Sequence, residues 1–255
     1  AMAREDYIDF THRWLDACIG ALAPHGALWV NIPDDTAAEV VVHLKQRGLH
    51  MINWCVWHYR FGQNTNTRFI NSKVHALYFA RARDPRPVAP ADAKRRGLSG
   101  TAVGPCRIWN PDTVLEVSDR RAVYFDPRTE DKNDGMPAGM RVPMDVWYGK
   151  YWGRIQGNNK ERRAHHHNQL PEIYLERVVR ACTQPGDLVL DPFTGSGTTG
   201  VVARDLDRRF IGIEYSLQNA HSAADRIEDG MIPREPIADS SSAIFKKRRA
   251  LDVPD

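Results

Sequence analysis

The chain of 255 residues has few cysteines and no long apolar run. Its four cysteines, Cys18, Cys55, Cys106 and Cys182, lie far apart and form no C-x-x-C pair. This spacing argues against a zinc site and a disulfide framework, so we interpret the thiols as buried and inert. No apolar stretch reaches the roughly 18 residues of a membrane-spanning helix, and the N-terminal AMAREDYIDF lacks the apolar core of a secretory signal. We therefore expect a cytoplasmic protein without a membrane partner.

The sequence also has little net charge, +3 from 35 basic and 32 acidic residues. The basic residues nevertheless form short runs, at 94–96, 120–121, 160–163 and 246–249. One such run is usually a solvated face, but several runs in one loop-rich region favour a polyanionic partner. The composition is therefore compatible with nucleic-acid binding and does not by itself demonstrate it.

Hydrophobic periodicity predicts α/β order in residues 1–82. A helical pattern over YIDFTHRWLDACIGAL precedes a short buried strand, ALWVNI, and a second helix, DDTAAEVVVHLKQRG. Two further segments, HMINWCVWHYRF and KVHALYFARA, have the composition of strands and could pair as an antiparallel hairpin.

The remainder of the chain divides into three parts. Residues 83–165 are rich in proline, glycine and charge, but they keep the aromatic residues that disordered linkers lack, so we expect loops and short elements there. Residues 166–230 return to α/β order, with a helix, a strand, a helix, a strand and a helix. Residues 231–255 are rich in proline and serine and end basic, which predicts a mobile tail.

A glycine-rich loop follows the first strand of the third part. In DPFTGSGTTG, residues 191–200, the glycines Gly195, Gly197 and Gly200 match the nucleotide-binding pattern G-x-G-x-x-G. The next strand ends in an acid, Glu214, which suits the two hydroxyls of a ribose. No G-K-[ST] follows the loop, so it is not a Walker A motif. We predict a nucleotide-like cofactor, with a glycine-rich turn that holds no ligand as the alternative.

Three features favour S-adenosylmethionine over NAD as the cofactor. Asp191 places a carboxylate at the strand tip, where it suits a cationic amino-acid group and not a diphosphate. Two threonines at the helix start offer hydroxyl donors to a carboxylate. Only 41 residues follow Glu214, so the other strands lie upstream and the nucleotide half comes last. An NAD-dependent oxidoreductase fits the glycine spacing but has the wrong order of halves and no evident proton relay.

The sequence resembles the β-class (permuted) DNA amino-methyltransferases, which modify adenine N6 or cytosine N4. DPFTGSGTTGVVARDLDRRFIGIEYS is similar to their cofactor motif, and HHNQLPEIYLERVVRACTQPGDLVLDPF to the segment before it. Residues 5–82 also resemble the family's helix–strand and its aromatic strand–loop–strand. The resemblance implies a Rossmann-like S-adenosylmethionine-dependent methyltransferase fold in circularly permuted order, with an inserted target-recognition region.

The resemblance implies a division of labour along the chain. Residues 1–82 would form the catalytic-side half, 83–165 the target-recognition region and 166–230 the cofactor-binding half, followed by the basic tail 231–255. The family usually has a lysine after this glutamine, whereas the sequence has Leu170 after Gln169, so we assign no contact to that side chain. The implied cofactor-binding residues are Asp191, Phe193, Gly195, Ser196, Gly197, Thr198, Glu214, Tyr215, Ser216, His166, Asn168 and Gln169.

The catalytic motif of this family, [DNS]-P-P-[YFW], does not occur in the sequence, which contains no Pro-Pro dipeptide. NIPDD at 31–35 is the nearest match, but it ends the wrong strand, so the catalytic residues stay unknown. We favour the interpretation that the chain starts just downstream of the motif. The alternative is a catalytically inactive relative that binds DNA or cofactor.

Aromatic and basic residues supply candidates for DNA contacts. Trp57, Tyr59 and Phe61, with Asn64, Asn66 and Asn71 nearby, could form a pocket for a flipped base, although Trp57 and Tyr59 share a strand face and could equally pack in the core. From these we select Trp57, Tyr59 and Asn71 as the base pocket. The histidines at 165–167 cannot all face one ion, so we expect no metal. The candidate phosphate contacts are Arg68, Lys73, Arg95, Arg96, Arg154 and Lys160.

These observations together predict a site-specific DNA methyltransferase. It would transfer a methyl group from S-adenosylmethionine to the exocyclic amino group of a flipped base in double-stranded DNA, with adenine N6 preferred over cytosine N4. A restriction–modification setting and association with the nucleoid would follow from such an activity. A homodimer is compatible with the sequence.

Overall fold

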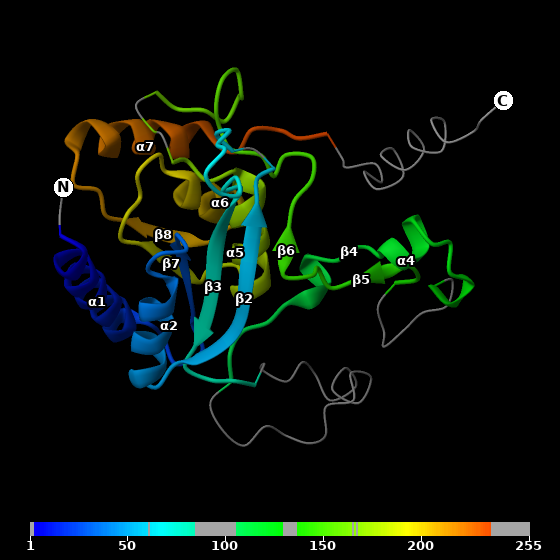
Figure 1. Cartoon of the computed structure of the whole chain (residues 1–255), viewed down its shortest axis with the longest axis horizontal. Coiled ribbons are helices and arrows are strands. Elements are labelled where there is room, and N and C mark those ends of the chain that lie inside the picture. Colours follow the sequence, from blue (N-terminus) through cyan, green and yellow to red (C-terminus); the bar gives the residue numbers. More distant parts are fainter. Residues whose placement is uncertain are drawn as a thin grey trace.

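The computed structural model describes residues 3–60, 62–84, 106–129, 137–164, 166 and 168–235 of the chain. Its centre is a four-stranded sheet with the order β1-β3-β2-β6 (Figure 1). The strands β2 and β3 pair as an antiparallel hairpin, as predicted, and β3 also pairs antiparallel with β1. The strands are β1 (Ala27–Ile32), β2 (His50–His58), β3 (Lys73–Ala80) and β6 (Val146–Trp147).

Two helices cover one face of this sheet. They are α1 (Arg4–Ala21), which begins three residues before the predicted helical segment, and α2 (Ala37–Gln46), which lies within its predicted segment. Leu15 of α1 and Leu44 of α2 are fully buried and share a core cluster with Leu77 of β3. The helical spacing of these apolar residues therefore attaches both helices to the sheet.

Helix α5 (Glu172–Cys182) covers the opposite face. Its residues Tyr174 and Val178 pack in a second core cluster with Cys55 and Trp57 of β2. Because side chains alternate across a strand, β2 sends these two side chains to α5, and β3 directs Leu77 to α1 and α2. The sheet therefore has apolar layers on both faces.

The third part of the chain has the order of helices and strands that its pattern predicts, and its two strands pair parallel in a sheet of their own. Strand β7 (Leu188–Asp191) is joined to β8 (Arg209–Gly212) by helix α6 (Thr198–Asp205). Helix α7 (Leu217–Asp229) follows, and the Ser216 hydroxyl caps its N-terminus by accepting a hydrogen bond from the Asn219 N–H. This unit presents the glycine-rich loop between β7 and α6.

The described part of the middle segment folds as loops and short elements, as predicted from its aromatic content. Its β4–β5 ribbon and α4 project away from the main body (Figure 1). Arg177 of α5 contacts Glu116 of this ribbon and thereby ties its base to the core. The elements are η1 (Pro111–Thr113), β4 (Glu116–Val117), α4 (Asp119–Ala122), η2 (Pro127–Thr129) and β5 (Met140–Arg141).

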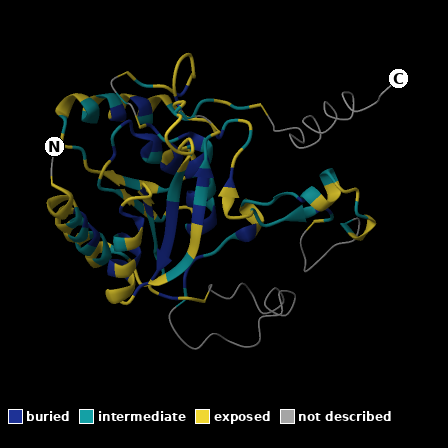
Figure 2. Ribbon diagram, viewed as in Figure 1, coloured by how far each residue is buried: buried dark blue, intermediate teal, exposed yellow. Residues whose placement is uncertain are grey.

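Both sheets keep an open edge within the described residues. Strand β1 pairs only with β3 there, and β7 only with β8. The outer face of the β7–β8 ribbon is also uncovered: Leu188 and Ile211 are 48% and 49% exposed. Figure 2 shows exposed residues on this ribbon, whereas β3 is largely buried. The ribbon therefore has unpaired strand edges and exposed apolar side chains, against which another strand could pair.

Among the described residues, no helix has both the length and the hydrophobicity needed to cross a bilayer.

The glycines of the helical elements differ in how much space surrounds them, which gives a stability test. A Cβ at Gly200 of α6 would lie 2.4 Å from Ile227 Cδ1 and 2.7 Å from Phe210 Cε1, whereas a Cβ at Gly20 of α1 would meet nothing within 4 Å. We expect Gly200→Ala to lower the free energy of unfolding by about 1–3 kcal/mol through overpacking. Gly20→Ala should leave it unchanged or raise it by up to ~1 kcal/mol. Urea denaturation measures both, and equal effects of the two changes would contradict this packing.

Candidate functional site: the loop between β7 and α6

The glycine-rich loop depends on two glycines with left-handed backbone conformations. Gly195 has φ of 50° and Gly197 has φ of 76°. A Cβ at Gly197 would come within 3.0 Å of Ala223 on α7, so this glycine allows close packing behind the loop. A Cβ at Gly195 would meet nothing closer than 3.7 Å. The side of the loop at Gly195 is therefore open to a ligand.

Two carboxylates brace this loop from its two ends. The Asp191 carboxylate accepts hydrogen bonds from Phe193 N–H at 3.0 Å and from Thr199 Oγ1 at 2.6 Å. The Glu214 carboxylate accepts from Gly195 N–H and Ser216 N–H, both at 2.9 Å. A carboxylate offers about four lone-pair sites. Both acids therefore keep acceptor sites for a ligand.

Backbone N–H groups keep Glu214 ionised. The hydrogen bond from Ser216 N–H, followed by that from Gly195 N–H, lowers the pKa of the Glu214 carboxyl from its ordinary value of 4.5, although partial desolvation opposes this. An ionised carboxylate accepts hydrogen bonds and donates none. Glu214 therefore presents only hydrogen-bond acceptors, beside Gly195 of the loop.

Aromatic side chains flank the two acids. Phe193 is 53% exposed and meets Trp14 of α1 edge-on, with 5.1 Å between ring centroids. Tyr215 is fully exposed beside Glu214. Such rings suit the apolar body and the base of S-adenosylmethionine, and the two carboxylates suit its ammonium and ribose groups. The residues of the loop therefore fit this cofactor.

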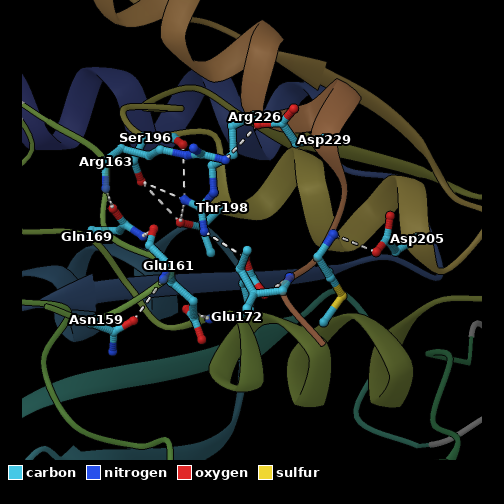
Figure 3. A network of polar contacts seen from close by, with 12 residues as sticks. Asn159, Glu161, Arg163, Gln169, Glu172, Ser196, Thr198, Asp205, Arg226 and Asp229 are labelled. Atoms are coloured by element: carbon cyan, nitrogen blue, oxygen red, sulfur yellow. Dashed lines mark hydrogen bonds and ion pairs between the residues drawn. The ribbon is translucent and has the colours of Figure 1, made fainter. Parts of the chain in front are cut away.

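The structure corrects our expectation for the loop hydroxyls. The side chains of Ser196 and Thr198 are buried, lie 3.1 Å apart and both contact Arg226 on α7 (Figure 3). The Thr199 hydroxyl donates to Asp191. All three hydroxyls therefore have partners within the protein, and those of Ser196 and Thr198 are buried. The α6 N-terminus has no side-chain cap, so its backbone N–H groups are the donors suited to a ligand carboxylate.

The network behind the loop was not predicted from the sequence. Arg226 donates through Nη2 to Glu172 Oε1 at 2.9 Å, and Glu172 Oε2 accepts from Ile232 N–H at 3.0 Å. The sequence held one signal, since Arg226 lies three positions after the buried Ala223 and therefore on the inner face of α7. A charge on a buried helix face predicts a buried partner.

The three predicted residues of the preceding segment have different surroundings. A Cβ at Gly195 would lie 4.0 Å from His166 Nδ1, so His166 is next to the loop. Asn168 Oδ1 accepts from Arg154 Nη2 at 3.2 Å. Gln169 is buried, accepting from Arg163 N–H at 3.0 Å and donating to the Glu161 carbonyl at 2.6 Å. The Gln169 amide therefore supports its own segment, which is a different role from the predicted cofactor contact.

The predicted base pocket is divided between core and surface. Trp57 is 4% exposed and its indole N–H donates to the Trp152 carbonyl at 2.6 Å, so its ring is core and not a free stacking face. Tyr59 is half-buried, with the Arg154 guanidinium 5.3 Å from its ring centre, and Asn71 is exposed. Phe61 lies outside the described residues.

The predicted phosphate contacts also differ among themselves. Arg68, Arg154 and Lys160 are exposed. Lys73 forms an ion pair with Asp34, which His75 also contacts, so its charge is partly neutralised. Arg95 and Arg96 lie outside the described residues.

Solved structures share this fold. The chain superposes with a TM-score of 0.57 on the PvuII DNA methyltransferase (cytosine-N4-specific), at 14% identity over 96% of this chain and 77% of that one. It superposes with a TM-score of 0.54 on TTHA0409, a putative DNA modification methylase from Thermus thermophilus in complex with S-adenosyl-L-methionine, at 19% identity over 88% and 78%.

Sequence comparison identifies the family. The chain is 28% identical over 225 residues to the Type II methyltransferase M2.DpnII of Streptococcus pneumoniae, covering 88% of this chain and 68% of that protein. It is 26% identical over 223 residues to M1.MboII of Moraxella bovis, covering 87% and 79%. A family model described as DNA methylase (N6_N4_Mtase) matches residues 2–225. The chain therefore belongs to the S-adenosylmethionine-dependent DNA methyltransferases that act on exocyclic amino groups.

Proposed function

We propose that this protein methylates an exocyclic amino nitrogen of a base in double-stranded DNA, adenine N6 in preference to cytosine N4, and that the loop at 191–200 with Glu214 is its cofactor site. The observation that carries the proposal is the geometry of Asp191 and Glu214. Backbone N–H groups and a threonine hydroxyl fix both carboxylates, yet each keeps acceptor capacity toward the open side of the loop.

Each group at the loop has a role that follows from its chemistry. When bound, S-adenosylmethionine supplies an electrophilic methyl group on a sulfonium. Glu214 would accept hydrogen bonds from the ribose hydroxyls, and Asp191 would accept from the ammonium group. The uncapped backbone N–H groups at the start of α6 would receive the carboxylate, and Phe193 and Tyr215 would shield the apolar parts.

Methyl transfer needs further groups that activate the target nitrogen. The lone pair of an exocyclic amine is delocalised into the ring, so acceptors for its N–H hydrogens must shift density back onto nitrogen. In this family the motif [DNS]-P-P-[YFW] provides them, and it is absent from the 255 residues. We propose that a strand carrying this motif, which is not part of the 255 residues, lies between the open edges of β1 and β7.

Helix α5 supports that location for the strand. Tyr174 Oη donates to Asn31 Oδ1 on β1 at 2.5 Å, and Val189 of β7 packs against the same core cluster as Tyr174. Both open-edged strands therefore rest on one helix layer without pairing to each other. A strand inserted there would end beside Asp191, because the carboxyl end of β7 carries that residue.

DNA would bind along the basic surface near the β2–β3 loop. Arg68, Arg154 and Lys160 are exposed there or in the following segment and would contact phosphates. Tyr59 and Asn71 would line the base pocket, with Trp57 supporting it from the core. We keep the division into a catalytic-side half, a recognition region, a cofactor-binding half and a tail, and we assign the activity to the cytoplasm, where the substrate would be chromosomal DNA.

A second candidate function is a non-catalytic DNA- or cofactor-binding protein. The absence of the catalytic motif from the sequence favours it. This candidate predicts that the protein binds cofactor but transfers no methyl group, even when the D-P-P-Y-type motif is supplied.

The first test is calorimetric titration of the chain with S-adenosylmethionine, and with NAD in parallel. We expect binding of the former only. Glu214→Gln should weaken it about 10- to 100-fold, because a hydrogen bond to a charged group contributes roughly 1.5–3 kcal/mol. Glu228→Gln, an exposed change on the neighbouring helix, is the matched control and should leave the affinity unchanged. Binding of NAD instead, or an unaffected Glu214→Gln variant, would refute the cofactor site.

The pKa of Glu214 gives a pH test of the same site. Because the folded protein lowers this pKa from its ordinary value of 4.5, the carboxylate stays ionised to lower pH than an unperturbed glutamate. We expect the affinity for S-adenosylmethionine to fall as the pH drops through the lowered pKa, because protonation removes a hydrogen-bond acceptor from Glu214. The Glu214→Gln variant should lack this fall, and an identical fall in both proteins would assign it to another group.

A test of base specificity requires a longer polypeptide that also contains the D-P-P-Y-type motif. We expect this longer polypeptide to transfer a labelled methyl group to duplex DNA. The 255-residue chain alone should bind the cofactor but transfer the methyl group very slowly. Chromatography of the hydrolysed DNA would identify N6-methyladenine, as we propose, or N4-methylcytosine. No methylated base at all would favour the non-catalytic candidate.

A further inference from the structure

A buried ion pair lies directly behind the cofactor loop. The Arg226 side chain is 1% exposed and that of Glu172 is fully buried. They join α7 to the start of α5 through Arg226 Nη2 and Glu172 Oε1, 2.9 Å apart. Such a pair must be well hydrogen-bonded to offset the loss of hydration of both charges, and an apolar pair of similar volume would join the helices at least as well. Holding α5 to α7 therefore does not by itself explain these two residues.

The other arm of the guanidinium contacts the loop. Arg226 Nη1 donates to the Ser196 carbonyl at 3.1 Å and lies 3.3 Å from Ser196 Oγ and 2.7 Å from Thr198 Oγ1. These acceptors lie on either side of Gly197, the left-handed residue that starts α6. One rigid, planar group therefore holds both flanks of the turn. The Ser196 carbonyl accepts from Arg226 and therefore points to the α7 side of the loop (Figure 3).

Glu172 is itself fixed, so the arginine is held in one orientation. Its second carboxylate oxygen accepts from Ile232 N–H at 3.0 Å, after the end of α7. Its backbone N–H donates to the buried Glu161 carboxylate at 2.8 Å, and Gln169 binds the Glu161 carbonyl. Desolvation raises the pKa of Glu161. Apart from the half-buried Ile232 N–H, the contacts of the pair are thus made by buried groups, which have few alternative partners.

We propose that Arg226, held by Glu172, is a positioning residue for S-adenosylmethionine. Arg226 would not contact the cofactor itself. It fixes the Ser196–Gly197–Thr198 turn from behind, so that the N–H groups of the first turn of α6 and the N–H of Gly195, which binds Glu214, are in place before the cofactor arrives. A loop ordered in advance binds more tightly because less conformational freedom is lost on binding. This inference rests on the cofactor site proposed above.

The test replaces both members of the pair, so that no unpaired charge is left buried. We expect the double variant Arg226→Met/Glu172→Met to melt cooperatively and to bind S-adenosylmethionine at least about tenfold more weakly than the wild type in calorimetric titration. Amide hydrogen exchange of residues 195–199 without ligand should become faster, and exchange in the β2–β3 hairpin should not change. A purely structural pair would not confine its effect to the loop.

Arg204→Met provides the matched control. Arg204 also ties α6 to α7, since its Nη1 donates to the Ile227 carbonyl, but within the described residues its side chain makes no hydrogen bond to the loop. Its loss should leave the affinity and the loop exchange at wild-type values. Should the double variant fail to fold, Arg226→Lys retains a charge beside Glu172 but cannot fork to Ser196 and Thr198, and we expect the same weakening in smaller degree.

The outcomes separate this inference from the proposed function. If the wild type does not bind S-adenosylmethionine, the cofactor site is refuted and with it the role of Arg226. A second outcome is that the wild type binds and Glu214→Gln weakens binding, while folded Arg226→Met/Glu172→Met or Arg226→Lys binds within twofold of the wild type. In that case the cofactor site stands and the positioning role of Arg226 is refuted. Weakened binding with faster loop exchange supports it.

Discussion

The packing of helix α5 is the constraint on which the rest of the structure depends. Along this helix, Tyr174 reaches β1, Val178 packs on β2, and Glu172 at its start binds Arg226 of the cofactor unit. The four-stranded sheet and the β7–β8 ribbon share no backbone pairing among the described residues. One buried helix therefore sets the distance between the face that would receive DNA and the loop that would receive the cofactor.

Periodicity and turn chemistry predict the elements well, because both act over a few residues. The β2–β3 hairpin, the glycine-rich loop and the Ser216 start of α7 follow from local patterns. The position of β3 between β1 and β2 is not a local property, since it depends on which strand edges meet after collapse. The same limit applies to Trp57, whose strand position suits either core or pocket until the partner Trp152 is known.

The network behind the loop shows why a binding motif is only half of a site. The sequence DPFTGSGTTG predicts which residues face a cofactor, but the hydroxyls of Ser196 and Thr198 face inward because of an arginine 30 and 28 residues away along the chain. Glu172 is 54 residues from Arg226. Charge pairs at such separations leave no periodic signal, apart from a charged residue on a helix face that should be apolar.

The uncovered β7–β8 ribbon has a consequence for handling the protein in solution. A bare parallel edge with half-exposed leucine and isoleucine is a template for edge-to-edge association between molecules. Copies that meet through β7 would occupy the position where an added strand would complete the sheet. If a strand that carries the catalytic motif occupies this position, as we propose, it would also remove the exposed edge and reduce self-association.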